Sequence, residues 1–318
     1  MIVREPFGEL LVDKFVLAAI QAAPVHFDRD ASVEKALGLI ADAAKQGATI
    51  AAFGECWIPG YPIFAYTPPT PLRWEASAEY IKQAVEVPSD ATDQLCKAAK
   101  AAGIDVVIGI TELDERTKST LYCSLLFIGR ECEILGKHRK LKPTLHERTV
   151  WGEGDGSSLS IYERAYGRIS GLSCWEHQMM LPGYALAQQG TQIHVAAWPG
   201  REPEQAPPPP VGMWPHQILL SRAFAAQTGS YVICTAGIYM KADYPEKYGE
   251  FMLPEQDGGS CIIDPRGEVI AGPVSGEETI IFAEGSLDLV RSVKAAVDIG
   301  GHYSRPDIFQ FNVKCPSD

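Results

Sequence analysis

Strand-like and helix-like hydrophobic patterns alternate along the first part of the chain. Residues 15–20 form an apolar run that predicts a strand, and a second such run lies at 48–53. Between them, apolar residues recur every three to four positions over 30–46, and Gly47 suits the end of a helix. Residues 58–72 are rich in proline, glycine and aromatic residues, which predicts an irregular loop.

The alternation continues towards the C-terminus, now with hairpins. Helices are predicted over 89–102, 179–190 and about 215–228. Strands are predicted at 104–111, 121–128, 134–136, 168–174, 192–198, 231–236, 259–264, 268–271 and 279–283. Helices mixed with hairpins indicate mixed sheets covered by helices. The proline-rich segment 202–210 is interpreted as a surface loop rather than a domain linker, because the same alternation continues beyond it.

The composition allows a large core, since hydrophobic residues make up 46% and charged residues 21% of the 318 residues. Asp and Glu number 40 against 28 Lys and Arg, which gives a net charge of −12. Neither nucleic acid nor an anionic membrane is expected as a partner of so acidic a chain. No stretch approaches the roughly 18 apolar residues that a membrane span needs, so a soluble protein is predicted.

Cysteine and histidine usage bears on location and on metals. Eight cysteines are scattered without a C-x-x-C pair, which is typical of a reducing compartment and predicts a cytoplasmic protein. The seven histidines show no ligand spacing. The sequence H-E-R-T-V at 146–150 begins like a zinc motif but has Val150 where the second histidine ligand must stand. Neither a metal nor a cofactor is therefore predicted.

Three side chains with possible chemistry stand at predicted strand ends. Glu55 and Lys140 each come just after a strand, and Cys174 ends one. Taken singly, a cysteine on a strand is most often a packing residue, and loop charges are most often solvated. A helix is predicted soon after Cys174, and the N–H groups of a helix N-terminus would favour the thiolate.

Taken together, the three residues predict nucleophilic catalysis. A free thiol has a pKa near ~8.5 and needs a base to react at neutral pH. A carboxylate alone opposes the thiolate charge, but a neighbouring ammonium removes this objection. Moving a proton from Cys174 to Glu55 beside Lys140 leaves the net charge unchanged, and the ammonium can stabilise charge that develops on a substrate.

Other motifs predict less. Gly152, Gly154 and Gly156 alternate without the spacing of a phosphate-binding loop. Ser173 is followed two positions later by Trp175, where G-x-S-x-G requires its second flanking glycine, so a serine hydrolase is not expected.

The segments around the three residues resemble the signatures of the nitrilase (carbon–nitrogen hydrolase) superfamily, in which Glu, Lys and Cys occur in this order. Glu55 stands in F-G-E-C-W, Lys140 and Glu147 in H-R-K-L-K-P-T-L-H-E-R, and Cys174 in S-C-W-E-H. The resemblance implies that Glu55 is the general base, Lys140 the stabilising cation, Cys174 the nucleophile and Glu147 a second, positioning glutamate. The second of these strings and the closing G-H-Y-S-R-P-D at 301–307 resemble the nitrilase branch more than the amidase and carbamoylase branches.

The resemblance extends over nearly the whole chain, from the strand at 15–20 to about residue 313. It implies an α/β fold, an αββα sandwich of two mixed sheets flanked by helices, in one domain over 1–318. It also implies a homodimer or a higher homo-oligomer. The chain ends soon after 301–307, so the extended filaments of some relatives are not expected.

The predicted activity is the hydrolysis of an organic nitrile to its carboxylic acid and ammonia, through a thioimidate and an acyl thioester. Hydrolysis of an amide or N-carbamoyl compound, or of cyanide, by the same residues remains open. A catalytically silent oligomeric binding protein is the least favoured alternative. Nearby aromatic residues favour an apolar pocket for aryl or arylalkyl groups, and the backbone N–H of Trp175 is a candidate donor to developing charge. Assigned to substrate binding are Trp57, Tyr61, Phe64, Trp175, His177 and Trp198.

Overall fold

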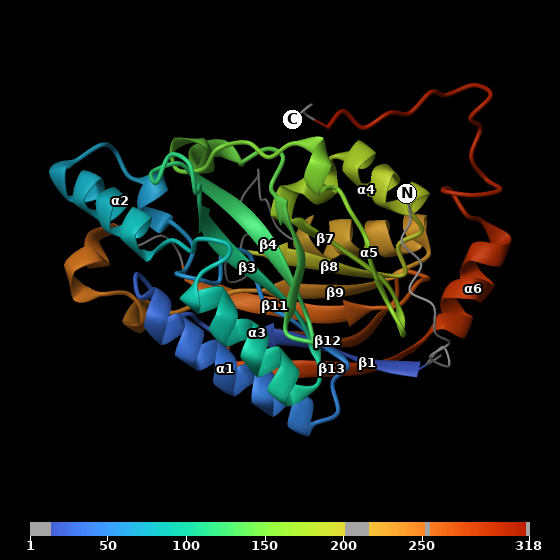
Figure 1. Ribbon diagram of the computed structural model, residues 1–318, viewed down its shortest axis with the longest axis horizontal. Coiled ribbons are helices and arrows are strands. Elements are labelled where there is room, and N and C mark those ends of the chain that lie inside the picture. Colours follow the sequence, from blue (N-terminus) through green and yellow to red (C-terminus); the bar gives the residue numbers. More distant parts are fainter. Residues whose placement is uncertain (1–13, 201–215, 252–254, 316–318) are drawn as a thin grey trace, which may run out of the picture.

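Two β-sheets lie face to face with helices on both outer sides in the computed structural model (Figure 1). The structure describes residues 14–200, 216–251 and 255–315. This arrangement confirms the predicted αββα sandwich of two mixed sheets. The segment 202–210, interpreted above as a surface loop, lies outside the described residues.

The six-stranded sheet, called sheet A, has the strand order β13-β1-β2-β3-β4-β5. Strands β1, β2 and β3 run parallel, and the other neighbours are antiparallel. The last of these strands along the chain, β13, pairs with the first along its full length, from Lys14 opposite Ser286 to Gln21 opposite Thr279. Its strands are β1 (Lys14–Gln21), β2 (Ile50–Ala52), β3 (Asp105–Leu113), β4 (Leu121–Gly129), β5 (Glu133–Arg139) and β13 (Thr279–Ser286).

The seven-stranded sheet, called sheet B, has the order β10-β11-β9-β8-β7-β6, and β12 pairs with β11. Strands β7, β8 and β9 run parallel, so their carboxyl ends meet at one edge. Its strands are β6 (Tyr162–Arg164), β7 (Gly167–Ser173), β8 (Ile193–Trp198), β9 (Tyr231–Ala236), β10 (Ile238–Tyr239), β11 (Gln256–Ile263) and β12 (Val269–Ser275).

Local sequence signals start and stop the helices. The Asp28 side chain accepts a hydrogen bond from Ala31 N at the start of α1, and Gly103 ends α3 in the left-handed conformation that glycine adopts readily. The described helices are α1 (Arg29–Lys45), α2 (Pro71–Gln83), α3 (Asp90–Ala102), α4 (Met180–Gln188), α5 (His216–Thr228) and α6 (Leu287–Ala296). Within the described ranges, none combines the length and apolarity that a bilayer span requires.

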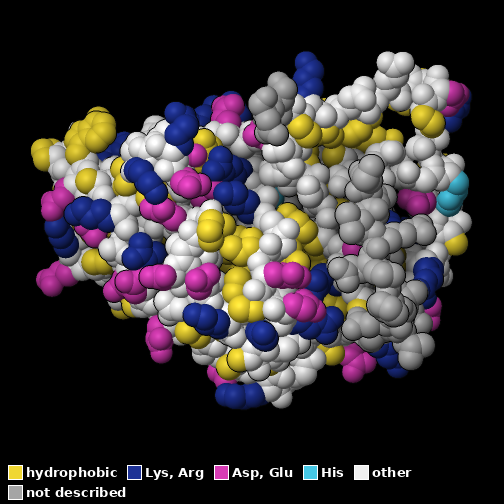
Figure 2. All heavy atoms as spheres, in the orientation of Figure 1, with side chains coloured by type: hydrophobic (Ala, Val, Ile, Leu, Met, Phe, Trp, Pro, Cys, Tyr) yellow, Lys and Arg dark blue, Asp and Glu magenta, His cyan; other side chains and the backbone are white. Residues whose placement is uncertain are grey.

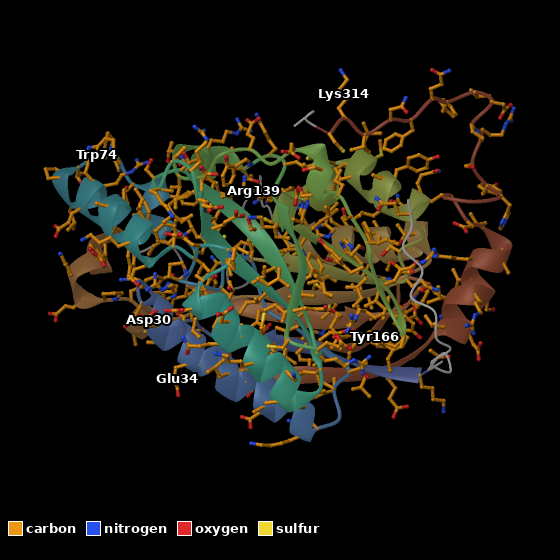
Figure 3. All side chains as sticks on the ribbon, in the orientation of Figure 1. Asp30, Glu34, Trp74, Arg139, Tyr166 and Lys314 are labelled. Carbon is orange, nitrogen blue, oxygen red and sulfur yellow. The ribbon has the colours of Figure 1, made fainter. Side chains whose placement is uncertain are left out.

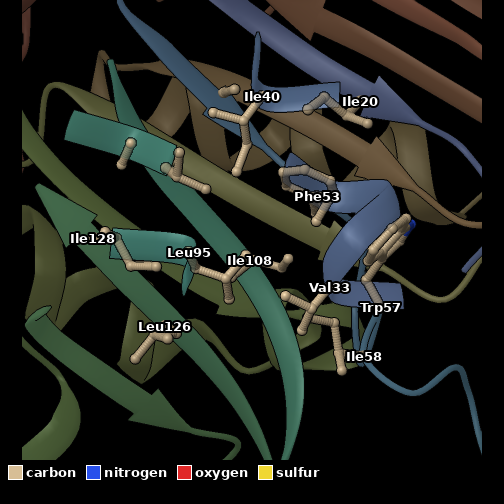
Figure 4. Close-up of a cluster of buried hydrophobic side chains, with 14 of the residues drawn as sticks. Ile20, Val33, Ile40, Phe53, Trp57, Ile58, Leu95, Ile108, Leu126 and Ile128 are labelled. Carbon is tan, nitrogen blue, oxygen red and sulfur yellow. The ribbon is translucent and has the colours of Figure 1, made fainter. Parts of the chain in front are cut away.

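Three apolar layers hold the sandwich together. Val33 and Ile40 of α1 and Leu95 of α3 pack on the outer face of sheet A (Figure 4). Leu172 and Phe224 belong to the layer between sheet B and its helices. Between the sheets lie Leu17, Val107, Leu125, Ile169, Val195 and Ile233. Each fully buried side chain of this kind contributes about 1.5–3 kcal/mol, so these layers dominate the stability.

The surface contributes less. Acidic and basic side chains are interspersed over the face shown in Figure 2. Exposed ion pairs such as Lys45 with Asp42, with Nζ and Oδ1 2.7 Å apart, stabilise by only about 0–1 kcal/mol.

The structure differs from the predicted elements mainly in helices. The segment 58–72 was expected to be irregular throughout, but it contains a 3-10 helix over Ile63–Tyr66 and the first residues of α2. Thr70 caps α2 by accepting a hydrogen bond from Arg73 N. Pro71 occupies the first turn, where a backbone N–H has no acceptor within the helix, so its absence in proline costs nothing. Proline at a helix start was thus interpreted as a loop signal. Helix α6 was not predicted either, although Ser286 caps it.

Candidate active site

Glu55 lies three residues beyond β2, where the chain passes between the two sheets. Its backbone N–H donates to Trp198 O of β8 at 3.1 Å, which ties this segment of sheet A to sheet B. Gly109 allows this segment to pass close to β3, because a Cβ at Gly109 would lie 2.2 Å from Gly54 O. The Glu55 side chain is fully buried.

Lys140 follows β5 and lies between two buried carboxylates. Its Nζ is 2.7 Å from Glu55 Oε1 and 2.7 Å from Glu147 Oε2, and its side chain is 0% exposed. Glu147 belongs to a 3-10 helix over Leu145–Thr149, and its Oε2 also accepts from Thr144 N at 2.6 Å. Two of the three ammonium donors are therefore occupied by carboxylates.

Cys174 follows β7 directly and opens a 3-10 helix over Cys174–Gln178, with α4 beginning two residues later. Its φ is +53°, a left-handed conformation that is uncommon for residues other than glycine. Cys56, next to Glu55, and Leu145, near Glu147, also have positive φ angles of +47° and +45°. Each such residue costs on the order of 1–3 kcal/mol, and such strain is concentrated at functional sites.

The structure brings together the four residues to which catalytic roles were assigned. One carboxylate oxygen each of Glu55 and Glu147 and the thiol sulfur of Cys174 all lie within 4.8 Å of one another. Lys140 bridges the two carboxylates. We call these four residues the catalytic group. Cys174 follows a strand of sheet B, whereas Glu55 and Lys140 follow strands of sheet A, so the group is assembled across the interface between the sheets.

The two oxygens of Glu55 have different surroundings. Oε1 accepts from Lys140 and, at 3.3 Å, from the thiol of Cys123 on β4. Oε2 is buried and has no hydrogen-bond partner among the described residues. Burial raises the pKa of Glu55 to about 7, against the opposing effect of the Lys140 charge. The adjacent carboxylates raise the pKa of Lys140 well above its ordinary value despite burial, so this side chain stays charged. Glu55 therefore offers a free oxygen and a pKa suited to accepting a proton near neutrality.

The thiol differs from expectation in one respect. Helix N–H groups were expected to favour the thiolate, and the Trp175 backbone N–H does form a hydrogen bond with Cys174. Burial and then the Glu55 charge nevertheless raise the pKa of Cys174 well above its ordinary value. One N–H group does not compensate for removal from water beside two carboxylates. The resting group is thus a neutral thiol, which must lose its proton as it reacts.

The residues assigned to substrate binding separate into two sets. Tyr61 lies at the catalytic group, because its hydroxyl donates to Glu147 Oε1 at 2.6 Å. Trp175 adjoins Cys174 and is half-buried, with its ring centroid 5.3 Å from that of His216. Trp57 and Phe64 are not brought to the group. The Trp57 indole donates to Ala22 O within the layer under α1, and Phe64 packs against Tyr80.

His177 and Trp198 form a layer behind Cys174. Their rings stack with centroids 5.4 Å apart. His177 Nδ1 donates to Cys174 O at 2.7 Å, and its Nε2 lies 3.0 Å from His194 Nε2. Burial lowers the pKa of His177 to about 4, so the ring is neutral. Both ring nitrogens are engaged by the protein, which favours support of the Cys174 turn over contact with a ligand.

Several side chains near the group were not identified from the sequence. Tyr66 contacts the Tyr61 hydroxyl at 3.0 Å, and the Trp151 ring centroid lies 5.9 Å from Lys140 Nζ. Trp151 lies three residues beyond the segment 138–148 that contains Lys140 and Glu147, so closeness to this motif was the available signal. Cys123 carried no such signal in the sequence, because a cysteine on a buried strand is usually a packing residue.

An αββα sandwich with Glu, Lys and Cys side chains buried together at its strand ends is the arrangement of a carbon–nitrogen hydrolase. A profile described as carbon–nitrogen hydrolase matches residues 16–295. The chain therefore belongs to the carbon–nitrogen hydrolase family, the nitrilase superfamily.

Known relatives agree with this assignment. The chain is 51% identical over 308 residues to a protein named Nitrilase 2 from an unknown prokaryotic organism, covering 96% of this chain and 93% of that one. It is 36% identical to an aliphatic nitrilase of Rhodococcus rhodochrous, covering 94% and 82%. It is 37% identical to an arylacetonitrilase of Aspergillus kawachii, covering 94% and 91%. The sequence relationship thus lies with the nitrilase branch.

A solved structure supports the fold. The crystal structure of Saccharomyces cerevisiae Nit3, described as a member of branch 10 of the nitrilase superfamily, matches with a TM-score of 0.71 at 21% identity. The match covers 93% of this chain and 98% of that one.

Proposed function

We propose that this protein hydrolyses an organic nitrile to a carboxylic acid and ammonia, with Cys174 as nucleophile. Each turnover consumes two water molecules. The observation that carries the proposal is the buried thiol within 4.8 Å of Glu55 and Glu147, with Lys140 bridging the two carboxylates. The relatives named nitrilases, with which alignment covers most of both chains, support a nitrile as substrate.

In the first step, Glu55 Oε2 takes the thiol proton as the sulfur attacks the nitrile carbon. This oxygen suits the role because it is buried without a partner while Oε1 is held by Lys140. The nitrile nitrogen gains the electron pair of the broken π bond, and Lys140 and the Trp175 N–H stabilise the developing charge. The proton then passes from Glu55 to nitrogen, which gives a neutral thioimidate.

Water completes the reaction in two further additions. Glu55 removes a proton from the first water as it adds to the thioimidate carbon and passes this proton to the nitrogen. The hydroxyl proton of the tetrahedral adduct is then transferred to the nitrogen as well, so ammonia leaves as the carbonyl forms. The product is an acyl thioester on Cys174. A second water, activated in the same way, releases the carboxylic acid and restores the thiol. Lys140 remains charged throughout and balances Glu55 and Glu147.

Aryl or arylalkyl nitriles are the proposed substrate class. The support is the position of Tyr61 at Glu147 and of Trp175 beside Cys174, which provides aromatic surface next to the thiol. Among the relatives, names include both an aliphatic nitrilase and an arylacetonitrilase, so a panel must include both kinds.

The test measures ammonia and acid release from matched aliphatic, aromatic and arylacetonitriles, and from the corresponding amides. Cys174→Ala is expected to abolish turnover of every substrate. Cys132→Ala, which removes a half-buried thiol outside the catalytic group, is the matched control and should retain activity. Full activity in Cys174→Ala overturns the mechanism, and cleavage of amides without nitriles favours an amidase instead.

A homodimer or larger homo-oligomer is also proposed. Its support is an apolar surface on the adjacent helices α4 and α5, where Met180 is 81%, Leu181 66% and Leu219 57% exposed. Light scattering of the purified protein checks this, with Leu219→Glu expected to shift the mass towards the monomer.

A cytoplasmic location is proposed from the cysteines. None of the eight, all of which lie in the described ranges, forms a disulfide, and six of them are buried. This is the usage of a reducing compartment. Fractionation of cells that produce the protein from its own gene checks the proposal, and recovery outside the cytoplasm contradicts it.

A further inference from the structure

Glu176, two residues after the nucleophile, has a fully buried carboxylate whose two oxygens are both occupied. Oε2 accepts from the backbone N–H of Ser173 at 2.8 Å, and Oε1 accepts from the backbone N–H of Leu141 at 2.8 Å. Both oxygens lie 3.1 Å from His138 Nε2. Both side chains are almost entirely inaccessible, with exposed fractions of 0% for Glu176 and 2% for His138.

The contacts define the charge of His138. Its Nδ1 lies 3.3 Å from Ser158 O, which can only accept, and 3.1 Å from Ser158 Oγ, whose hydrogen is directed to Asp155 O. Its Nε2 faces only carboxylate oxygens of Glu176. Both ring nitrogens must therefore donate, and the ring is an imidazolium. A buried carboxylate is thus paired with a buried cation.

The two backbone contacts of Glu176 belong to different sheets. Leu141 directly follows Lys140 at the end of β5 in sheet A, and Ser173 directly precedes Cys174 at the end of β7 in sheet B. One carboxylate therefore joins the neighbours of the cation and of the nucleophile.

We propose that Glu176, held by His138, is a positioning residue that sets Cys174 against Lys140 across the interface between the sheets. The inference rests on the proposed function of Cys174 and Lys140. Glu55 does not depend on this link, because its own backbone N–H bonds to Trp198 O of sheet B. Loss of Glu176 should therefore displace the thiol and the cation relative to each other while leaving the base in place.

The left-handed backbone at Cys174 makes this support necessary. Glu176 holds the backbone N–H of Ser173, the residue before Cys174, and His177 holds the peptide group after Cys174 through Cys174 O. With φ at +53°, the residue would relax to a more common conformation if either hold were lost. Relaxation would move the sulfur away from the carboxylates.

A second polar link between the sheets provides a matched control. Tyr166, just before β7, donates to Asp105 Oδ2 at the start of β3 at 2.5 Å, and both residues are buried. This link lies at the end of β7 opposite to Cys174. In Figure 3, Tyr166 is well separated from Arg139, the residue before Lys140. Tyr166→Phe therefore weakens the same interface without touching the catalytic group.

The experiment compares Glu176→Gln, His138→Gln and Tyr166→Phe in the full-length protein. Each is measured for kcat, KM, melting temperature and the rate at which iodoacetamide alkylates Cys174, identified by peptide mass. In Glu176→Gln one backbone N–H must face an amide NH2, so kcat and the alkylation rate should each fall at least tenfold with KM changed less. His138→Gln keeps a hydrogen-bond donor near the position of Nε2, so its kcat and alkylation rate should fall less than those of Glu176→Gln. Tyr166→Phe should lower the melting temperature and leave kcat and alkylation within twofold.

Two results overturn the inference. One is that a folded variant, either Glu176→Gln or His138→Gln, keeps the wild-type alkylation rate and the wild-type kcat. The other is an equal loss in Tyr166→Phe at the same drop in melting temperature, which would make the effect general to the interface. Failure of the proposed function is distinguishable, because it appears as turnover by Cys174→Ala.

Discussion

The two ends of β7 carry similar links between the sheets but serve different purposes. At the start, Asp105 receives the hydroxyl of Tyr166 and the guanidinium of Arg164, with Arg164 Nε 2.8 Å from Oδ2. At the other end, Glu176 receives two backbone N–H groups and His138. In both places a buried carboxylate from one sheet accepts hydrogen bonds from several donors, and at least one of these donors belongs to the other sheet.

The difference lies in what is attached to each carboxylate. Asp105 is bound mainly through side chains, which can be replaced without moving the backbone. Glu176 is bound through the backbone N–H groups of the two residues that adjoin Lys140 and Cys174, so a change there moves both reacting residues. A buried polar link stabilises a fold wherever it lies, but it controls chemistry only where it fixes the backbone of the site.

The largest expected effect comes from removing the cation at the catalytic end. Lys140→Met leaves Glu55 and Glu147 close together without the charge between them, and it removes a donor to the substrate nitrogen. We expect kcat/KM to fall by about three orders of magnitude or more. Steady-state ammonia release measures this loss. Lys142→Met is the matched control, because Lys142 is half-exposed and pairs with the exposed Glu153.

Acidic pH should reversibly reduce the activity of the catalytic group at the Cys174 end of β7. Glu55 must be charged to accept the thiol proton, and its pKa is raised to about 7. Activity should therefore fall about tenfold per pH unit below 7, measured as kcat/KM against pH. Stability has the opposite sign: the folded state holds this proton more tightly than the unfolded state, so the contribution of Glu55 weakens as pH rises from about 4.5 to about 7. A flat activity profile down to pH 5 would contradict the role of Glu55, and Tyr166→Phe should follow the wild-type curve.

Tyr61→Phe should have a smaller effect at the same end. It removes the hydroxyl that donates to Glu147 Oε1 at 2.6 Å but leaves the Lys140 and Thr144 contacts to Oε2. Loss of one hydrogen bond to a carboxylate is worth about 1–2 kcal/mol, so kcat should fall about five- to thirtyfold. Tyr66→Phe, one contact further from Glu147, should lose less when assayed in parallel.

The smallest effect on activity, and a clear one on stability, is expected at the other end of β7. Tyr166→Phe removes one donor to Asp105, which keeps Arg164 and the backbone N–H of Arg130. The free energy of unfolding should fall by about 1–3 kcal/mol in urea titrations. A loss of activity beyond twofold in the folded variant would mean that the two ends are coupled.

Much of the fold could be predicted because local patterns and final elements coincide. The runs at 121–128 and 231–236 became β4 and β9 with boundaries within a residue. At 48–53 the apolar run was longer than β2, because only Ile50–Ala52 pair with both neighbouring strands. Hydrophobicity shows what is buried, and pairing is decided by strands far away in the sequence.

The site was predictable as a set of residues but not as an environment. Motifs identified Glu55, Lys140, Glu147 and Cys174, and the structure assembles them. Motifs could not show that Trp57 points into the core, since it stands only two positions after Glu55 and the turn between them decides its direction. Nor could they show a raised thiol pKa, because desolvation depends on what surrounds the turn.

The pairing of β13 with β1 has a consequence for protein synthesis. A growing chain that ends before residue 279 already contains the whole catalytic group, yet the outer edge of β1 has no partner strand. An apolar strand with a bare edge invites pairing with other chains. The ribosome therefore releases the strand that protects this edge only after the reactive thiol has been made. A chain truncated after residue 278 should accumulate as aggregate, whereas one truncated just before 301–307 should stay in solution.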